Sequence, residues 1–253
     1  MLAFQTSGRL SLERKRRSFD GTEVITTLHN LIELKDWAKI DTFLSDISKS
    51  SSLPINIVDD CFLHHACRHR NAPLRTIRRI AKVFPSCLNA RDDHGRYPIH
   101  VAVMNGCMPD LIAFLIKSNT AYVGTQDISG KTPMHYLGQC YAEKYCATAY
   151  SIDEVDNLTS CVVKLLIEAA PESVNMEDED EMNPIEIALL NDTHIKVVKA
   201  MQRASRNDWR IRKKEELKSK DVVHEDTSSS RLSSKLLFNQ RGSMHLRVGA
   251  STA

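Results

Sequence analysis

Apolar residues recur every three or four positions along most of the chain, in short segments separated by polar turns. The four longer segments are RTIRRIAKVF (75–84), DLIAFLIKSN (110–119), SCVVKLLIEAA (160–170) and HIKVVKAMQRA (194–204). Folded as an α-helix, each segment carries one apolar stripe. A shorter apolar segment precedes each of the four, so the pattern predicts a series of helix pairs.

The turns before the shorter segments repeat one motif. Residues 92–106 read DDHGRYPIHVAVMNG and residues 127–138 read DISGKTPMHYLG. In both, Asp stands three residues before Gly, Pro stands three residues after it, and His stands five residues after it. Weaker copies lie at residues 59–66 (DDCFLHHA) and 178–188 (DEDEMNPIEIA), the latter with Glu181 at the glycine position.

The copies follow a nearly constant period. It is 36 residues from His64 to His100 and 35 residues from His100 to His135. The interval of 51 residues from His135 to Glu186 indicates an insertion inside that unit. Because no single helix pair can bury its own stripe, the period predicts units that stack on their neighbours.

Residues with special backbone preferences support these boundaries. The positive φ of a tight turn is available to Gly95 and Gly130. Proline costs no hydrogen bond where a helix begins, the position of Pro98, Pro133 and Pro184. Residues that tolerate the left-handed conformation are expected to end the shorter helices, namely Gly106, Asn71 and Asp192.

The motif resembles the ankyrin repeat, whose pattern is T-P-L-H-x-A on a period near 33. Thr-Pro-Met-His at residues 132–135 is the nearest match, and Tyr-Pro-Ile-His-Val-Ala at residues 97–102 is the next. The resemblance covers residues 55–204, and residues 22–50 resemble a diverged first unit or cap. It implies an all-α solenoid of four to five helix-turn-helix units in a repeat domain at residues 21–205.

Composition separates two flanking segments from this domain. Residues 1–20 are basic and expected to be disordered, and residues 206–253 form a basic, Ser-rich tail, partly helical and then disordered. The chain carries a net charge of +2, but residues 126–204 alone sum to −8 and the tail to +5. The repeat domain is therefore expected to run from a basic first half to an acidic second half.

The seven cysteines are an odd number spread through helical pattern, which favours a reducing compartment over a disulfide framework. No apolar run approaches the roughly 18 residues of a membrane span. We expect a cytoplasmic protein, with a nuclear location left open by basic runs at residues 14–17 and 210–214. A transit peptide at the N-terminus also stays open.

Candidate chemistry is sparse. The run Cys-x-x-His-His-x-Cys at residues 61–67 suggests zinc, but one helix does not converge four ligands on a point, so we expect a structural role. No oxyanion hole or third orienting group accompanies a Cys–His pair. His100 and His135 are interpreted as fold residues that bridge neighbouring turns. We therefore expect no metal, no cofactor and no catalytic residue.

The resemblance implies a monomer that binds another protein. In ankyrin proteins the turn tips and the exposed side of the shorter helices form a concave binding surface, and unrestrained positions beside each motif are its candidates. These positions are Asp60, Arg68, His69, Asp93, His94, Arg96, Met104, Asn105, Ile128, Ser129, Lys131, Gln139, Glu179, Asp180 and Met182.

The insertion at residues 138–150 supplies further candidates. Its tyrosines are Tyr141, Tyr145 and Tyr150, and ordinary stacking does not need them. Tyrosine is a favoured anchor at interfaces, so Tyr141 and Tyr145 are added to the predicted partner site. Local packing of these rings is the alternative.

Nucleic acid is the alternative partner. The densest basic stretch of the repeat domain lies between Arg68 and Lys82, and the tail is also basic. No aromatic residue interleaves with the arginines and no known reading motif appears, so nucleic acid is the weaker hypothesis.

Overall fold

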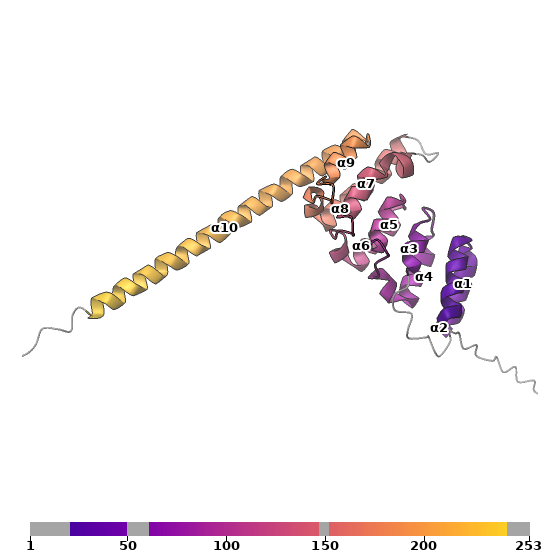
Figure 1. Ribbon diagram of the computed structural model, residues 1–253, viewed down its shortest axis with the longest axis horizontal. Coiled ribbons are helices and arrows are strands. Elements are labelled where there is room, and N and C mark those ends of the chain that lie inside the picture. The colour runs from indigo at the N-terminus through magenta and orange to yellow at the C-terminus, as the bar shows by residue number, and fades with distance from the viewer. Residues whose placement is uncertain (1–20, 50–60, 147–151, 242–253) are drawn as a thin grey trace, which may run out of the picture. The chain divides into compact units, whose positions relative to one another are not determined.

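The computed structural model describes residues 21–49, 61–146 and 152–241, and every regular element in these ranges is a helix, which confirms the predicted all-α class there (Figure 1). The predicted disordered N-terminus, residues 1–20, lies outside the described residues. The elements are α1 (Gly21–Glu33), α2 (Trp37–Lys49), α3 (Phe62–Cys67), α4 (Leu74–Val83), η1 (Pro85–Leu88), α5 (Pro98–Met104), α6 (Pro109–Ser118), η2 (Thr120–Tyr122), α7 (Pro133–Gln139), η3 (Tyr141–Cys146), α8 (Ile152–Ala169), η4 (Pro171–Asn175), α9 (Pro184–Leu190) and α10 (Ile195–Arg241).

The chain divides into two units, residues 1–204 and 205–253. In the first unit the helices pack in two rows. The short helices α3, α5, α7 and α9 follow α1 in one row, each contacting the next, and α2, α4, α6 and α8 form the second row in the same way. The stripes of the longer helices are buried between the rows, with Ile77, Leu111 and Val162 at most 1% exposed. Burial of such side chains stabilises a stack by about 1.5–3 kcal/mol each.

The short helices begin in one way. Proline occupies the first helical position of α5, α7 and α9. The third helical residue then accepts a hydrogen bond from the backbone N–H that precedes the helix. His100 Nδ1 accepts from Tyr97 N (3.1 Å), His135 Nδ1 from Thr132 N (3.0 Å), and a carboxylate oxygen of Glu186 accepts from Asn183 N (2.9 Å). Glu186 replaces histidine in the last copy because either side chain can cap the helix.

The helix ends agree with the sequence in two places and differ in one. Gly106 and Asp192 follow α5 and α9 with φ of 65° and 50°, as predicted. Asn71 is not among the described residues with positive φ, so its predicted left-handed role is wrong. α3 ends in turn geometry at Arg68 instead, with backbone bonds back to residues 64 and 65.

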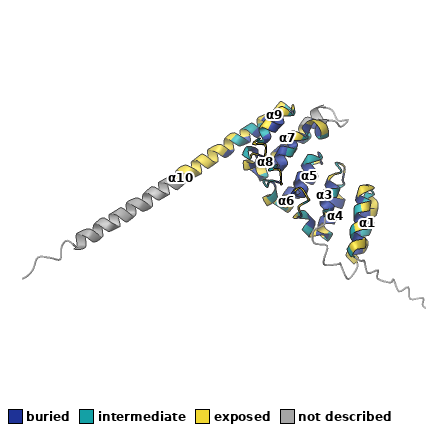
Figure 2. Cartoon of the chain, in the orientation of Figure 1, coloured by how far each residue is buried: buried dark blue, intermediate teal, exposed yellow. Residues whose placement is uncertain are grey.

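α10 is longer than the sequence suggested. It continues through residues 227–235, the Ser-rich segment that was expected to be disordered, and ends at Arg241. Residues 242–253, the last part of the predicted tail, lie outside the described residues. Arg, Lys and Glu at residues 206–218 are good helix formers, which favours continuation of the helix beyond the first unit. Side chains 209–218 are all exposed (Figure 2).

Replacement of Gly95 by valine should destabilise the fold. Gly95 has φ of 73°, and an added Cβ would lie 3.0 Å from Cγ1 of Ile128 in the next turn. A β-branched residue at positive φ is strained, so Gly95→Val should lower the free energy of unfolding by about 1–3 kcal/mol in urea denaturation. Glu181 occupies the equivalent position with φ of 58°, so Glu181→Gly is the matched control and should leave stability unchanged or raise it by up to about 1 kcal/mol. A Gly95→Val variant as stable as the parent would contradict this account of the turn.

Candidate functional site

The turn before α5, residues 92–96, is held by one carboxylate. Asp92 Oδ1 accepts hydrogen bonds from the backbone N–H groups of His94 (3.0 Å) and Arg96 (2.9 Å). The backbone closes the same loop, since Asp92 N donates to Arg96 O (3.0 Å) and Gly95 N donates to Asp92 O (2.8 Å). The Arg96 guanidinium binds the other carboxylate oxygen at 2.8–2.9 Å. The geometry of this turn therefore comes from an aspartate that accepts hydrogen bonds from the N–H groups of its own turn.

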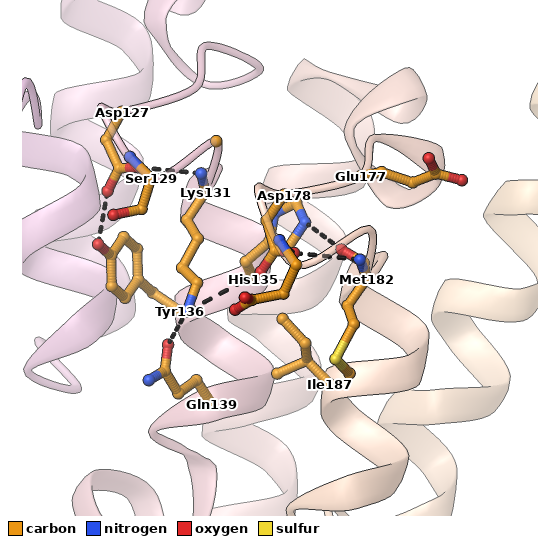
Figure 3. Close-up of polar contacts among 12 residues, drawn as sticks. Asp127, Ser129, Lys131, His135, Tyr136, Gln139, Glu177, Asp178, Met182 and Ile187 are labelled. Carbon is orange, nitrogen blue, oxygen red and sulfur yellow. Dashed lines mark hydrogen bonds and ion pairs between the residues drawn. The ribbon is translucent and has the colours of Figure 1, made fainter.

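The turn before α7, residues 127–131, repeats the arrangement (Figure 3). Asp127 Oδ1 accepts from Ser129 N and Lys131 N, both at 2.9 Å. The hydroxyl of Tyr136 donates to Asp127 Oδ2 (2.5 Å), where the preceding turn uses an arginine. Burial and the neighbouring carboxylate raise the pKa of Tyr136, so it stays a donor. The Lys131 ammonium donates to Gln139 Oε1 (3.2 Å).

The turn before α9, residues 178–182, is the third copy. Asp178 Oδ1 accepts from Asp180 N (3.0 Å) and Met182 N (3.1 Å). Its other oxygen lies 3.9 Å from the Lys131 ammonium of the preceding turn (Figure 3). Glu181 adopts a positive φ at the position that glycine occupies in the other two turns, so this turn is the most strained of the three.

Hydrogen bonds link the three turns into a ladder. Ile128 N donates to His94 O (3.0 Å), and Glu179 N donates to Ser129 O (3.1 Å). Both links join the tip of one turn to the tip of the one before it. The backbone at the tips is thus satisfied internally, and the tip side chains stay exposed.

Histidines join each short helix to the next turn. The Nε2 atoms of His64, His100 and His135 lie 2.7 Å from Arg96 O, 3.0 Å from Thr125 O and 3.2 Å from Met182 O. His100 and His135 also accept at Nδ1, so both rings are neutral tautomers with the proton on Nε2. With both nitrogens engaged, neither ring has a free site for proton transfer to a substrate.

Six of the predicted partner residues are exposed side by side at the tips. They are Asp93, His94, Ile128, Ser129, Glu179 and Asp180. Ile128 is 64% exposed, which is unusual for an isoleucine in a well-packed unit. Because the tip backbones are hydrogen-bonded in a row, these side chains form one continuous surface, called the turn-tip surface below.

Other predicted partner residues are engaged within the chain. Arg96 is paired with Asp92 and donates to Sδ of Met104, Asn105 donates to Val101 O (2.8 Å), and His69 packs on Trp37 with ring centroids 5.9 Å apart. Arg68 and Gln139 are exposed, and Lys131 and Met182 are half-buried. Asp60 lies outside the described residues.

The prediction that Tyr141 and Tyr145 anchor a partner is wrong, because both rings are in the core. They are 5% and 3% exposed, and the Tyr145 hydroxyl donates to Val103 O (2.8 Å). The η3 segment folds back onto earlier units, where the Arg70 guanidinium donates to the backbone carbonyl of Lys144. Local packing, the alternative interpretation of the insertion, holds for these two residues, and Tyr150 lies outside the described residues.

Several arginines of the 68–82 stretch make contacts within the chain. Arg70 is used by η3, as described above. Arg75 and Arg79 both face Asp41 of α2, at 3.9 Å and 3.3 Å, and Arg78 lies over the ring of Phe114 with its guanidinium carbon 5.7 Å from the centroid. Arg75, Arg78 and Lys82 nevertheless remain exposed on α4, so the alternative of nucleic-acid binding stays a prediction.

The side chains of the Cys-x-x-His-His-x-Cys run do not converge on one point, because some are buried in the core and others contact neighbouring helices. Cys67 and His64 are buried, and His65 lies 3.4 Å from a carboxylate oxygen of Glu33. Within the described residues, no group of three or more His, Cys, Asp or Glu side chains is arranged to hold a metal ion.

Sequence reasoning overlooked two features of the surface. At the second turn Tyr136 binds the aspartate that an arginine binds at the first, and a motif search does not reveal this change of partner. Leu189 and Leu190 are 54% and 71% exposed at the end of α9. Their signal was present in the sequence, because the run Ile-Ala-Leu-Leu at residues 187–190 holds more apolar residues than one stripe requires.

No protein-family model matches the sequence, and no curated protein matches it. Among the described residues, no helix is both long enough and apolar enough to cross a bilayer.

Acid should weaken the stack through its histidines. Burial lowers the pKa of His100 to about 4 and also lowers the pKa values of His64 and His135. A group with a depressed folded-state pKa contributes stability above its unfolded pKa of about 6.5, and this contribution is lost as the pH falls toward the folded value. The free energy of unfolding should fall by on the order of 3 kcal/mol for His100 alone between pH 7.5 and pH 4. In urea titrations His100→Gln should be less stable at pH 7.5 and show a shallower pH dependence, and an equal slope would contradict this assignment.

The tyrosines of η3 should affect stability. Tyr145→Ala leaves a cavity and should lower the free energy of unfolding by about 3 kcal/mol or more. Tyr145→Phe retains the ring and loses only the bond to Val103 O, so it should cost about 1 kcal/mol. Thermal or urea denaturation of both variants tests this. Unchanged stability of Tyr145→Ala would show that the ring does not pack in the core.

Proposed function

We propose that this chain is an ankyrin-like repeat protein that binds another protein through the turn-tip surface. The observation that carries the proposal is the ladder of three turns. Each turn is closed by an aspartate, linked to its neighbour through the backbone, and followed by a short helix that begins with proline. Such a scaffold fixes the backbone while the tip side chains remain available, which is the arrangement that repeat proteins use for recognition.

The chemistry of the surface favours a partner with apolar and basic groups. Ile128 stands exposed between the tips at His94 and Glu179. An apolar side chain bordered by polar groups is typical of an interface centre. The third turn adds exposed carboxylates at Glu177, Glu179 and Asp180, so a partner with basic residues at that end would be oriented by charge.

The proposed role is binding rather than catalysis. The buried histidines use both ring nitrogens for the fold, as at His100 and His135. Burial raises the pKa of the Cys107 thiol to about 12 and places that of Cys67 well above its ordinary value, so neither is a thiolate nucleophile near neutral pH. Cys67, Cys107, Cys140 and Cys161 are thiols outside any disulfide, which favours a reducing cytoplasmic or nuclear compartment.

A charge placed at the centre of the surface should abolish partner binding. Ile128→Glu puts a carboxylate where we expect a desolvated contact, so the affinity should fall by at least about 30-fold, equivalent to about 2 kcal/mol. The partner is first isolated with the tagged full-length chain, and its binding to each variant is then measured by surface plasmon resonance. The thermal stability of Ile128→Glu should match that of the parent because the side chain is exposed.

Leu34→Glu is the matched control. Leu34 is 75% exposed in the turn between α1 and α2, away from the three linked turns, and the substitution makes the same chemical change. Its affinity should stay within about twofold of the parent. Equal affinities of the two variants for the partner would show that recognition lies elsewhere on the chain.

A further inference from the structure

A groove lies between the second-row helices α2 and α4, away from the turn-tip surface. It has a volume of about 590 Å³. Its described lining residues are Ser45, Ser48, Lys49, Arg79, Lys82 and Val83. Small-molecule sites usually enclose about 300–1,000 Å³, so the groove is large enough for a ligand bigger than a lone ion.

The groove is positively charged. Lys49, Arg79 and Lys82 each contribute a cation, and Asp41 is the carboxylate that faces them, 3.3 Å from Arg79. Within the described residues neither lysine forms an ion pair. The C-terminal ends of α2 and α4 add roughly half a negative charge each. The three cations of the lining outnumber Asp41, so the groove attracts an anionic ligand.

The guanidinium of Arg79 is held in place before any ligand binds. It donates to Ser45 Oγ and is paired with Asp41, and its side chain is only one-third exposed. A fixed guanidinium loses less conformational entropy when it binds an anion than a free one does. The two lysines are exposed and can move to meet the same anion.

Two hydroxyls can be redirected toward a ligand. Ser45 Oγ donates to Asp41 O (2.9 Å) and Ser48 Oγ donates to Leu44 O (2.7 Å), one helical turn back. Those carbonyls also belong to the helical hydrogen-bond ladder of α2, so they stay satisfied when a hydroxyl rotates away. The groove thus combines three cations with two hydroxyl donors that can be released.

We propose that this groove binds a phosphate group, carried either by a small metabolite or by a phosphorylated side chain. A phosphate monoester carries nearly two negative charges and three acceptor oxygens, which suits one guanidinium, two ammonium groups and the serine hydroxyls. The described lining has no aromatic side chain on which a nucleic-acid base could stack, which favours a phosphate monoester over a single-stranded nucleic acid.

The site is tested by calorimetric titration of the full-length chain with inorganic pyrophosphate at low ionic strength. One saturable site is expected, and Lys82→Gln should weaken it by about fivefold or more. Lys117→Gln is the matched control, because Lys117 stands at the equivalent position of α6, 35 residues later, and is equally exposed. It should weaken binding by less than about twofold. Amide NMR shifts should move at Ser45, Lys49 and Lys82.

Competition then separates the two sources of phosphate. Displacement of pyrophosphate by glucose 6-phosphate at lower concentration than by O-phosphoserine would indicate a metabolite, and the reverse order would indicate a modified protein side chain. The proposal is overturned if no saturable binding is seen at millimolar pyrophosphate, or if Lys82→Gln and Lys117→Gln behave alike. It is also overturned if a DNA duplex displaces pyrophosphate more effectively than either monoester. Ile128→Glu should leave pyrophosphate binding unchanged, so this test is independent of the turn-tip surface.

Discussion

The aspartate that closes each of the three described turns is the interaction on which the second half of the stack depends. Asp127 and Asp178 are 8% and 7% exposed, and each accepts hydrogen bonds from two backbone N–H groups of its own turn. A hydrogen bond to a charged group contributes about 1.5–3 kcal/mol, so the carboxylate adds to the backbone hydrogen bonds that close the turn. Once it closes, the next helix starts at a fixed place, and the following turn can pair with it through the backbone. The starting points of α5, α7 and α9 follow from this local closure.

The features that the sequence predicted are those with a local cause. Gly95, the helix-starting prolines and the left-handed position of Asp192 depend on backbone preferences within a few residues, and a repeating motif made them visible. The prediction of a left-handed conformation at Asn71 was wrong because α3 ends earlier, in turn geometry that the motif does not encode. The prediction that tyrosines of the insertion bind a partner was wrong for a different reason. Tyr145 is buried by a fold-back onto α5, and a contact between residues 42 positions apart leaves no trace in a periodic pattern.

For the candidate site, too, the sequence predicted the features that have a local cause. The exposure of Ile128 and Glu179 was predictable from their positions beside the motif, because side chains at the turn tips do not pack in the core. Arg96 also stands beside the motif, yet it is tied to Asp92, since a long side chain can reach back across its own turn. Lys49 of the α2–α4 groove carried no signal at all. It meets Arg79 and Lys82 only because two helices far apart in sequence lie side by side.

The histidine bridges bear on how the chain is assembled during translation. An emerging turn meets two groups already in place in the preceding unit, a ring N–H such as that of His100 and a tip carbonyl such as that of His94. Both groups lie earlier in the chain, so they have already been synthesised when the new turn leaves the ribosome. The row of turns is therefore suited to growth in the direction of synthesis, one unit at a time, and the fold-back of η3 onto α5 is a later addition to units already formed.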